Sequence, residues 1–195
     1  MLKDRYFYPL AIALIAGIIW YALSQGQHEK LTPAHILENG YIIEKENLAK
    51  LNASPGTSCD FVKETAQEAA YVILKSNIAR ENTPPSVGVF APLGPTLETV
   101  FAERNLRITV RARQGKNNPL SEFDIGYFTA DVGDSGWQRK TLTPKWENYV
   151  IKFSPKAPVN NEGIDYLGIW PGEKGDGKTM DIQFIKIDVL PKLRN

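Results

Sequence analysis

The sequence predicts an all-β domain, an antiparallel β-sandwich, that follows one N-terminal apolar helix. From residue 41 onward, short runs of alternating apolar and polar residues are separated by clusters of Gly, Pro, Asn and Asp. This texture is typical of a sandwich, in which each strand buries one of its two faces. Residues 1–30 instead contain one long apolar stretch, which is typical of a membrane-spanning helix.

The composition excludes several classes of protein. Hydrophobic residues make up 43% and charged residues 23% of the 195 residues, as in a folded globular protein. Lys and Arg total 23 against 22 Asp and Glu, so we expect no nucleic-acid partner. The single cysteine is Cys59, and both histidines precede residue 40. The main domain therefore lacks an intrachain disulfide, a Ser–His or Cys–His catalytic centre and the usual zinc ligands, and we expect Cys59 to be buried and unreactive.

Residues 6–23 are predicted to cross a membrane. A helix of this length covers about 27 Å, close to the thickness of the hydrocarbon layer. Aromatic residues at 6–8 and at 20–21 suit the two interfaces of a bilayer. We therefore expect residues 1–24 to be a single-pass transmembrane anchor, followed by a polar juxtamembrane linker at 25–40 with one helical turn.

A cleaved secretory signal is the alternative interpretation of the same segment. Ala22, Leu23 and Ser24 offer the small residues that a signal peptidase requires. Both interpretations export the rest of the chain. We expect a cell-membrane protein whose domain, residues 41–195, is extracytoplasmic, in the periplasm.

Several runs within residues 41–195 are predicted strands. Three of them alternate clearly, and their inward sets are Leu106, Ile108, Val110 and Ala112, then Phe123, Ile125 and Tyr127, then Tyr149, Ile151 and Phe153. Residues 69–76 and 165–170 are more continuously apolar and are predicted to be interior strands. Residues 60–69 are interpreted as a strand and a turn, although they also contain a helical pattern.

Residues 172–179, GEKGDGKT, match the spacing of a nucleotide-binding phosphate loop. Such a loop binds phosphate because it lies at the N-terminus of a helix. After Thr179, however, apolar residues alternate as in a strand, and the phase of the alternation changes at Phe184–Ile185, which indicates a β-bulge there. The sequence therefore predicts a glycine-rich hairpin loop and no nucleotide.

From about residue 40 to residue 190 the order of features resembles the galactose-binding-like jelly roll of many carbohydrate-binding modules. The stretches GDSGWQRKTLTPKWENYVIKFSP and IDYLGIWPGEKGDGKTMDIQFIKIDVL carry this resemblance. It implies two antiparallel sheets packed face to face. It also implies glycan binding through aromatic side chains of loops or sheets in many members, a structural calcium ion near the last strand in some, and protein contacts alone in others.

Three tryptophans are the candidate platforms for a sugar ring. Trp137 follows a predicted turn, Trp146 begins a strand on the face opposite Tyr149, and Trp170 lies at a strand end before a proline. Sugars present apolar C–H faces that stack on aromatic rings. The alternative for each tryptophan is packing in the core or at a sheet edge.

Charged side chains supply two further candidate sites. Arg107, Arg111 and Arg113 share one face of a strand and form a row suited to carboxylate or phosphate groups. The alternative is a solvated face paired with acidic residues of the next strand. For the calcium ion, the candidate ligands are Asp176, Asp181, Glu44 and Glu46.

These observations predict a membrane-anchored, non-catalytic binding module whose ligand is a glycan. The alternative is an accessory subunit that docks onto a larger membrane complex. An enzyme is not expected, because a glycosidase needs two carboxyl groups at a defined separation and the sequence singles out no such pair. We predict no cofactor; a structural calcium ion is only what the resemblance implies for some members.

Overall fold

A computed structural model describes residues 4–25, 32–83, 88–130, 133–157 and 163–191. The chain forms two compact units, Met1–Thr32 and Pro33–Asn195. The first unit contains helix α1 (Asp4–Gln25). Helix α2 (Pro33–Asn39) is the first element of the second unit. The second unit therefore begins earlier than the domain boundary expected at residue 41.

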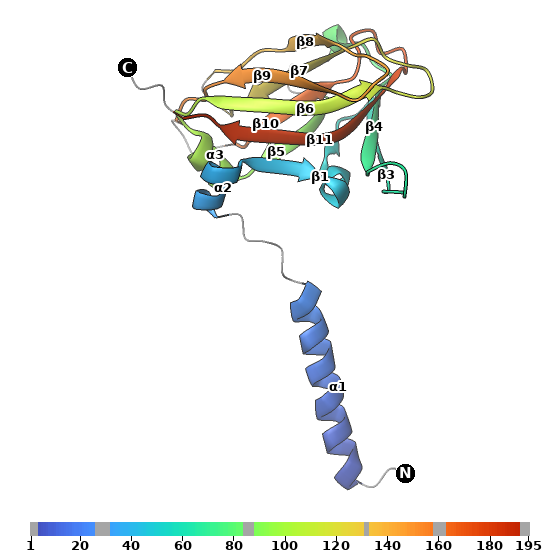
Figure 1. Ribbon diagram of the computed structural model, residues 1–195, viewed down its shortest axis with the longest axis vertical. Helices are drawn as coiled ribbons and strands as arrows, with labels where there is room; N and C mark the ends of the chain where they lie inside the picture. The colour runs from blue at the N-terminus through green and yellow to red at the C-terminus, as the bar shows by residue number, and fades with distance from the viewer. Residues whose placement is uncertain (1–3, 26–31, 84–87, 131–132, 158–162, 192–195) are drawn as a thin grey trace. The chain divides into compact units, whose positions relative to one another are not determined.

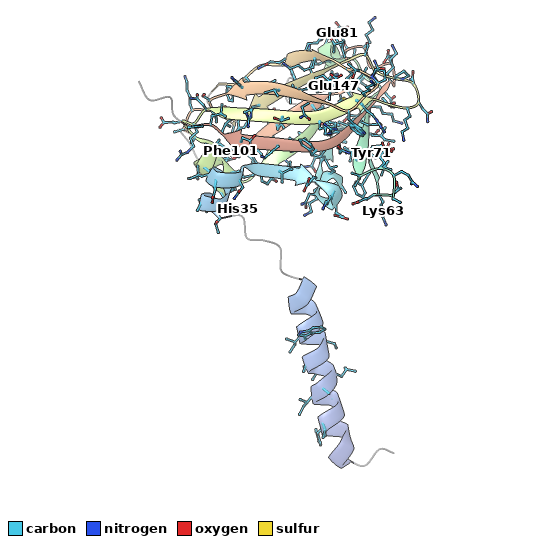
Figure 2. All side chains as sticks on the ribbon, in the orientation of Figure 1. His35, Lys63, Tyr71, Glu81, Phe101 and Glu147 are labelled. Carbon is cyan, nitrogen blue, oxygen red and sulfur yellow. The ribbon has the colours of Figure 1, made fainter. Side chains whose placement is uncertain are left out.

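Helix α1 confirms the predicted N-terminal helix. The large apolar side chains of this helix that the structure describes are exposed, and Figure 2 draws them as sticks along the helix. These exposed side chains are Tyr8, Ile12, Leu14, Ile15, Ile18, Ile19 and Trp20. Among the described residues, no helix combines the length and the apolar character that crossing a membrane requires. The predicted transmembrane span is therefore not supported, and residues 26–31 of the predicted linker lie outside the described residues.

The second unit is built mainly of strands. After α2 its elements are β1 (Tyr41–Glu44), the 3-10 helix η1 (Lys45–Lys50), β2 (Asn52–Ala53), β3 (Thr57–Val62), β4 (Tyr71–Ser76), the 3-10 helix η2 (Arg80–Asn82), β5 (Val89–Leu93), α3 (Pro95–Phe101), β6 (Leu106–Gln114), β7 (Glu122–Phe128), β8 (Gln138–Thr141), β9 (Glu147–Phe153), β10 (Asp165–Trp170) and β11 (Thr179–Val189). Residues 63–70, between β3 and β4, are not helical, which confirms the interpretation of this stretch as a strand and a turn.

The strands form two antiparallel sheets that pack face to face. Among the described residues, sheet A has the order β3-β4-β11-β6-β9, with β1 also paired to β11, and sheet B has the order β2-β5-β10-β7-β8. Figure 1 shows β11 as a long red strand flanked by β6 and β1. The predicted β-sandwich is confirmed. Strands β4 and β10 both lie inside their sheets, as their apolar sequences predict.

The core lies between the two sheets. All members of the three predicted inward sets are in the buried cluster or, in the case of Phe153, packed against it. Because side chains alternate along a strand, the intervening residues face outward. The outer face of sheet B therefore carries every second residue of β5, β10, β7 and β8, and these residues are absent from the core cluster.

Strand β11 contains the predicted bulge, but at a different residue. The register with β6 shifts between Ile182 and Phe184, so Gln183 is the extra residue. Met180 and Ile182 face the core before the bulge, and Ile185 faces it afterwards. Alternation from Met180 through Ile182 predicts that Phe184 faces inward and that the bulge follows it. The Phe184 side chain is instead outside the core cluster, so the bulge lies before Phe184.

Helix α2 corrects the expectation that residues 33–39 belong to a solvated linker. Ile36 is completely buried and belongs to the core cluster, and α2 contacts α3 and β11. The sequence gives little sign of this role, because a single apolar side chain of a mostly polar segment provides the anchoring contact. Burial of one isoleucine stabilises such a short helix by roughly 1.5–3 kcal/mol.

We predict that Ile36→Ala lowers the free energy of unfolding of the second unit by about 3 kcal/mol, because it opens a cavity in a packed core. Leu37→Ala is the matched control: Leu37 is the next residue of the same helix and is 39% exposed. We expect this control to cost less than about 1 kcal/mol. Urea unfolding of both variants measures the difference, and equal effects would show that α2 is not part of the core.

Candidate functional site

The structure separates the three candidate tryptophans. Trp137 and Trp170 lie together on the outer face of sheet B, with ring centroids 6.4 Å apart. Trp146 lies on the outer face of sheet A, where Arg113 covers its ring at 4.2 Å. Trp170 is fully buried, and its indole N–H donates to the carbonyl of Gly172. Trp137 is half-buried, so of this pair it is the tryptophan that a ligand can reach.

Five aromatic residues form a continuous group on the outer face of sheet B, which we name the aromatic strip. Its members are Phe90, Tyr166, Phe128, Trp137 and Trp170. Neighbouring centroids are 4.7 to 6.4 Å apart, and Tyr166 stacks on Phe128 with an interplanar angle of 17°. The strip includes residues of three neighbouring strands of sheet B, β5, β10 and β7, and Trp137, which directly precedes β8. Three of its rings, those of Phe90, Tyr166 and Trp137, are half-buried.

Two glycines let the strip lie flat against the sheet. Gly126 of β7 and Gly168 of β10 are directly opposite each other in the register. A Cβ atom at Gly168 would lie 2.8 Å from the Trp137 ring, and one at Gly126 would lie 2.8 Å from the Phe128 ring. Such distances are too short for carbon atoms in contact. The absence of both side chains therefore makes room for the two rings.

Four charged residues next to the strip form a closed circuit, which we name the ion-pair ring: Asp124, Arg139, Glu173 and Arg80. Asp124 pairs with Arg139 at 3.1 Å and with Arg80 at 3.2 Å. Glu173 pairs with Arg139 at 2.8 Å and with Arg80 at 3.5 Å. The ring joins β7, β8, η2 and the loop between β10 and β11, and Asp124 is opposite Trp170 in the register.

The two carboxylates of the ring differ in environment. The side chain of Asp124 is 4% exposed and that of Glu173 is 51% exposed. A buried carboxylate requires paired cations and hydrogen bonds. Both arginines form ion pairs with Asp124, and Arg139 also donates two hydrogen bonds to it. The hydrogen bond from Arg139 holds the pKa of Glu173 below its ordinary value.

The predicted arginine row lies on the outer face of sheet A, and each arginine has partners there. Arg107 pairs with Asp188 at 3.1 Å. Arg113 pairs with Asp181 at 2.8 Å and with Glu68 at 2.7 Å. The third arginine, Arg111, donates to Gln183 and Asn148. This arrangement matches the alternative interpretation, a strand face paired with residues of neighbouring strands.

The predicted calcium ligands do not form a metal site. Among the described residues, no group of three or more His, Cys, Asp or Glu side chains is placed to hold a metal ion. Asp181 is paired with Arg113, and Asp176 is paired with Lys178 at 3.0 Å. Glu44 ends β1 and Glu46 lies in η1. These residues do not fit the calcium ion as they are arranged, and calcium binding stays a prediction.

The glycine-rich segment 172–179 is followed by a strand, as predicted. Thr179 is the first residue of β11, and its hydroxyl donates to the carbonyl of Asn117. Gly172 and Gly175 have positive φ angles, which glycine adopts at little cost in turns. The segment therefore lacks the helix N-terminus on which a phosphate loop depends.

Cys59 and one pocket complete the candidate sites. Burial, with a smaller effect of Asp60, raises the pKa of the Cys59 thiol to about 11, so the thiol is protonated at neutral pH and unreactive. A pocket of about 670 Å³ is lined by Asn105, Leu106, Lys152, Phe153, Ser154, Leu190 and Pro191. Its one aromatic ring, that of Phe153, packs against Tyr127 of the core and offers no platform.

Most of the aromatic strip and the whole ion-pair ring were missed at the level of sequence. One signal was present in residues 165–170, which are apolar at consecutive positions although a strand of a two-layer sandwich buries one face. The second apolar face of β10, with Tyr166 and Trp170, belongs to the strip. Which strands lie beside β10 is a property of the topology, and no local pattern predicts it.

No protein-family model matches this sequence, and no curated protein matches it significantly. Solved structures do match. The CBM22-2 xylan-binding domain of Xyn10C from Paenibacillus barcinonensis superposes with a TM-score of 0.57 at 11% identity, covering 77% of this chain and 99% of that domain. The C-terminal family 22 carbohydrate-binding module of Clostridium thermocellum Xyn10B gives a TM-score of 0.54 at 13% identity, covering 80% and 95%.

A third structure is the tandem CBM22-1–CBM22-2 domain of the same Xyn10C, with a TM-score of 0.50 at 12% identity. The match covers 74% of this chain and 43% of the tandem, so this chain spans less than half of that protein. At such identities the likeness shows the fold alone. It confirms that the second unit has the sandwich fold of carbohydrate-binding modules.

The ion-pair ring predicts a pH-dependent contribution to stability. Because the pKa of Glu173 is lowered in the folded state, its contribution is fully present above the ordinary glutamate pKa of about 4.3 and is lost as the pH falls through the lowered value. We expect the wild-type protein to melt above the Glu173→Gln variant at pH 7 and to lose that advantage below about pH 4. Melting curves of both proteins from pH 3 to 7 test this, with Glu64→Gln, an exposed residue, as the control. If the difference in melting temperature between the wild-type protein and Glu173→Gln is the same at every pH, the Glu173 carboxylate does not supply this stabilisation.

Proposed function

We propose that this chain is a non-catalytic carbohydrate-binding module, and that its glycan site is the outer face of sheet B. The aromatic strip is the observation that carries the proposal. Inward-facing residues of a sandwich are used by the core, whereas the strip points away from it. A continuous group of rings on an outer face marks a binding surface.

The chemistry of the strip suits a sugar chain. Aromatic rings stack on the C–H faces of sugars, and a planar charged group such as the Arg139 guanidinium donates hydrogen bonds to sugar hydroxyls. Neighbouring strands are about 4.8 Å apart, so the part of the strip on β5, β10 and β7 spans about 10 Å. This length fits an oligosaccharide better than a monosaccharide.

The neighbouring structures supply the first ligand to test. One similar module is xylan-binding by name, and another belongs to the same numbered family of carbohydrate-binding modules. We therefore propose a xylan-type glycan. The carboxylates beside the strip, Asp124 and Glu173, are both paired with arginines, which suits binding and not acid–base catalysis.

A docking subunit is the alternative function, and it would need a broad apolar surface. In the described part of the second unit, the large hydrophobic side chains with most exposure are Leu37, Ile42, Val150 and Ile164. Leu37 lies in α2, Ile42 in β1, Val150 in β9 and Ile164 in the segment before β10. The aromatic strip therefore favours the glycan proposal.

The location of the module is a separate proposal. We propose that α1 holds the module at the cell membrane with the second unit in the periplasm, on the basis of the apolar sequence and the exposed apolar side chains of α1. Membrane fractions washed with alkaline carbonate should retain the chain, and protease added to spheroplasts should digest the second unit. Recovery of the chain in the soluble cytoplasmic fraction would contradict this.

We predict that Trp137→Ala weakens xylohexaose binding at least about tenfold, because the reachable tryptophan of the strip is lost. Trp146→Ala is the matched control, since Trp146 lies on the outer face of sheet A, packed against Arg113 and Tyr71. We expect its affinity to stay within about twofold of wild type. Isothermal titration calorimetry measures both.

The two variants separate the ways in which the proposal can fail. Loss of binding in Trp146→Ala alone would move the site to sheet A. No binding of xylo-, cello- or manno-oligosaccharides by the wild-type protein would refute the glycan proposal.

A further inference from the structure

The two arginines of the ion-pair ring converge on the exposed carboxylate of Glu173. Arg139 Nη1 lies 2.8 Å from one carboxylate oxygen, and Arg80 Nη2 lies 3.5 Å from the other. Guanidinium groups bind carboxylates strongly through charge-assisted hydrogen bonds. Here each of the two carboxylate oxygens of Glu173 faces a different arginine. The pair of arginines is therefore a preformed receptor for one carboxylate, and a side chain of the protein occupies it.

Glu173 is the partner that can leave. Asp124 is buried and fixed in the middle of the sheet, whereas half of the Glu173 side chain faces solvent. The backbone at Glu173 is held independently, because its carbonyl accepts a hydrogen bond from the amide of Arg80 at 2.9 Å. Rotation of the Glu173 side chain alone would expose both guanidinium groups without unfolding the loop. Glu122, 4.0 Å from Arg139, is a more distant carboxylate.

The receptor lies within reach of a sugar on the strip. Trp137 directly precedes β8 and lies two residues before Arg139, so their backbones are at most about 7 Å apart. Arg139 also faces Asp124 across the β7–β8 pair. A sugar ring stacked on Trp137 would therefore carry its substituents toward the ion-pair ring.

We propose that the ion-pair ring is a carboxylate subsite, and that the glycan bound by this chain is acidic and carries uronic acid. This inference rests on the glycan-binding function proposed above. In it the ligand's carboxylate takes the place of Glu173 between Arg139 and Arg80. The ring contains two arginines and two carboxylates, one of which is Asp124. The second carboxylate is that of Glu173 in the free protein and that of the ligand in the complex, so the exchange leaves no unpaired buried charge. A neutral sugar offers the arginines only hydroxyl groups and does not displace Glu173.

The test compares two ligands that differ in one carboxylate: xylohexaose, and a xylo-oligosaccharide of similar length with one glucuronic acid branch. Glu173→Gln removes the competing charge. We expect the variant to bind the acidic ligand about tenfold more tightly than the wild-type protein does, with xylohexaose affinity changed far less. The gain should shrink at high salt, because exposed charge interactions are screened. A gain in affinity cannot arise from misfolding.

Two controls complete the design. Glu64→Gln changes the net charge by the same amount on an exposed residue remote in sequence from the ring, and should leave both affinities unchanged. Arg139→Gln should abolish the preference for the acidic ligand, whereas Arg107→Gln, on sheet A, should keep it. The melting temperature of each variant shows whether it is folded.

The outcomes distinguish the two proposals. Binding of xylohexaose with no preference for the acidic ligand in Glu173→Gln would overturn the carboxylate subsite and leave the glycan function standing. No binding of either ligand by any of the proteins would overturn both. If Glu64→Gln increases the preference for the acidic ligand as much as Glu173→Gln does, the effect is one of net charge in general. This result would also overturn the subsite.

Discussion

Two sheets packed face to face give every strand one inner and one outer side, and this constraint organises the second unit. The inner sides are filled by the apolar residues that alternate along β6, β7, β9 and β11. Hydrophobic burial between the sheets is the main stabilising contribution in such a fold. Any apolar group that remains on an outer side therefore needs a different explanation. The aromatic strip, with five rings in contact, is such a group.

The strip and the ion-pair ring depend on one another through the backbone of sheet B. Gly126 and Gly168 leave the space in which the rings of Phe128 and Trp137 lie against the sheet. Two residue pairs further along the same strands, Trp170 lies opposite Asp124, which belongs to the ion-pair ring. An apolar platform thus ends at a pair of arginines. This combination suits a ligand with both apolar faces and polar or charged substituents, as sugars have.

Alternation predicted the strands well, because a period of two is a local property of the sequence. It also predicted the change of phase in β11, although Phe184 was assigned to the wrong side of the bulge. One helical turn was expected within residues 25–40, but the packing of α2 against the core was not, since Ile36 alone carries its burial. The candidate site was predicted in part: Trp137 stood out after its turn, but the ion-pair ring joins Arg80, Asp124, Arg139 and Glu173 from four distant segments. Long-range topology brings them together, and no spacing in the sequence encodes it.

The most direct test of the account is to observe which tryptophan responds to a glycan. Indole N–H signals in ¹⁵N-labelled protein report on Trp137 and Trp146 separately, and these residues lie on opposite faces of the sandwich. Titration with a xylo-oligosaccharide that carries glucuronic acid should shift the Trp137 signal in a saturable way and leave the Trp146 signal in place. A response of Trp146 alone, or of neither residue, would contradict the assignment of the glycan site to sheet B.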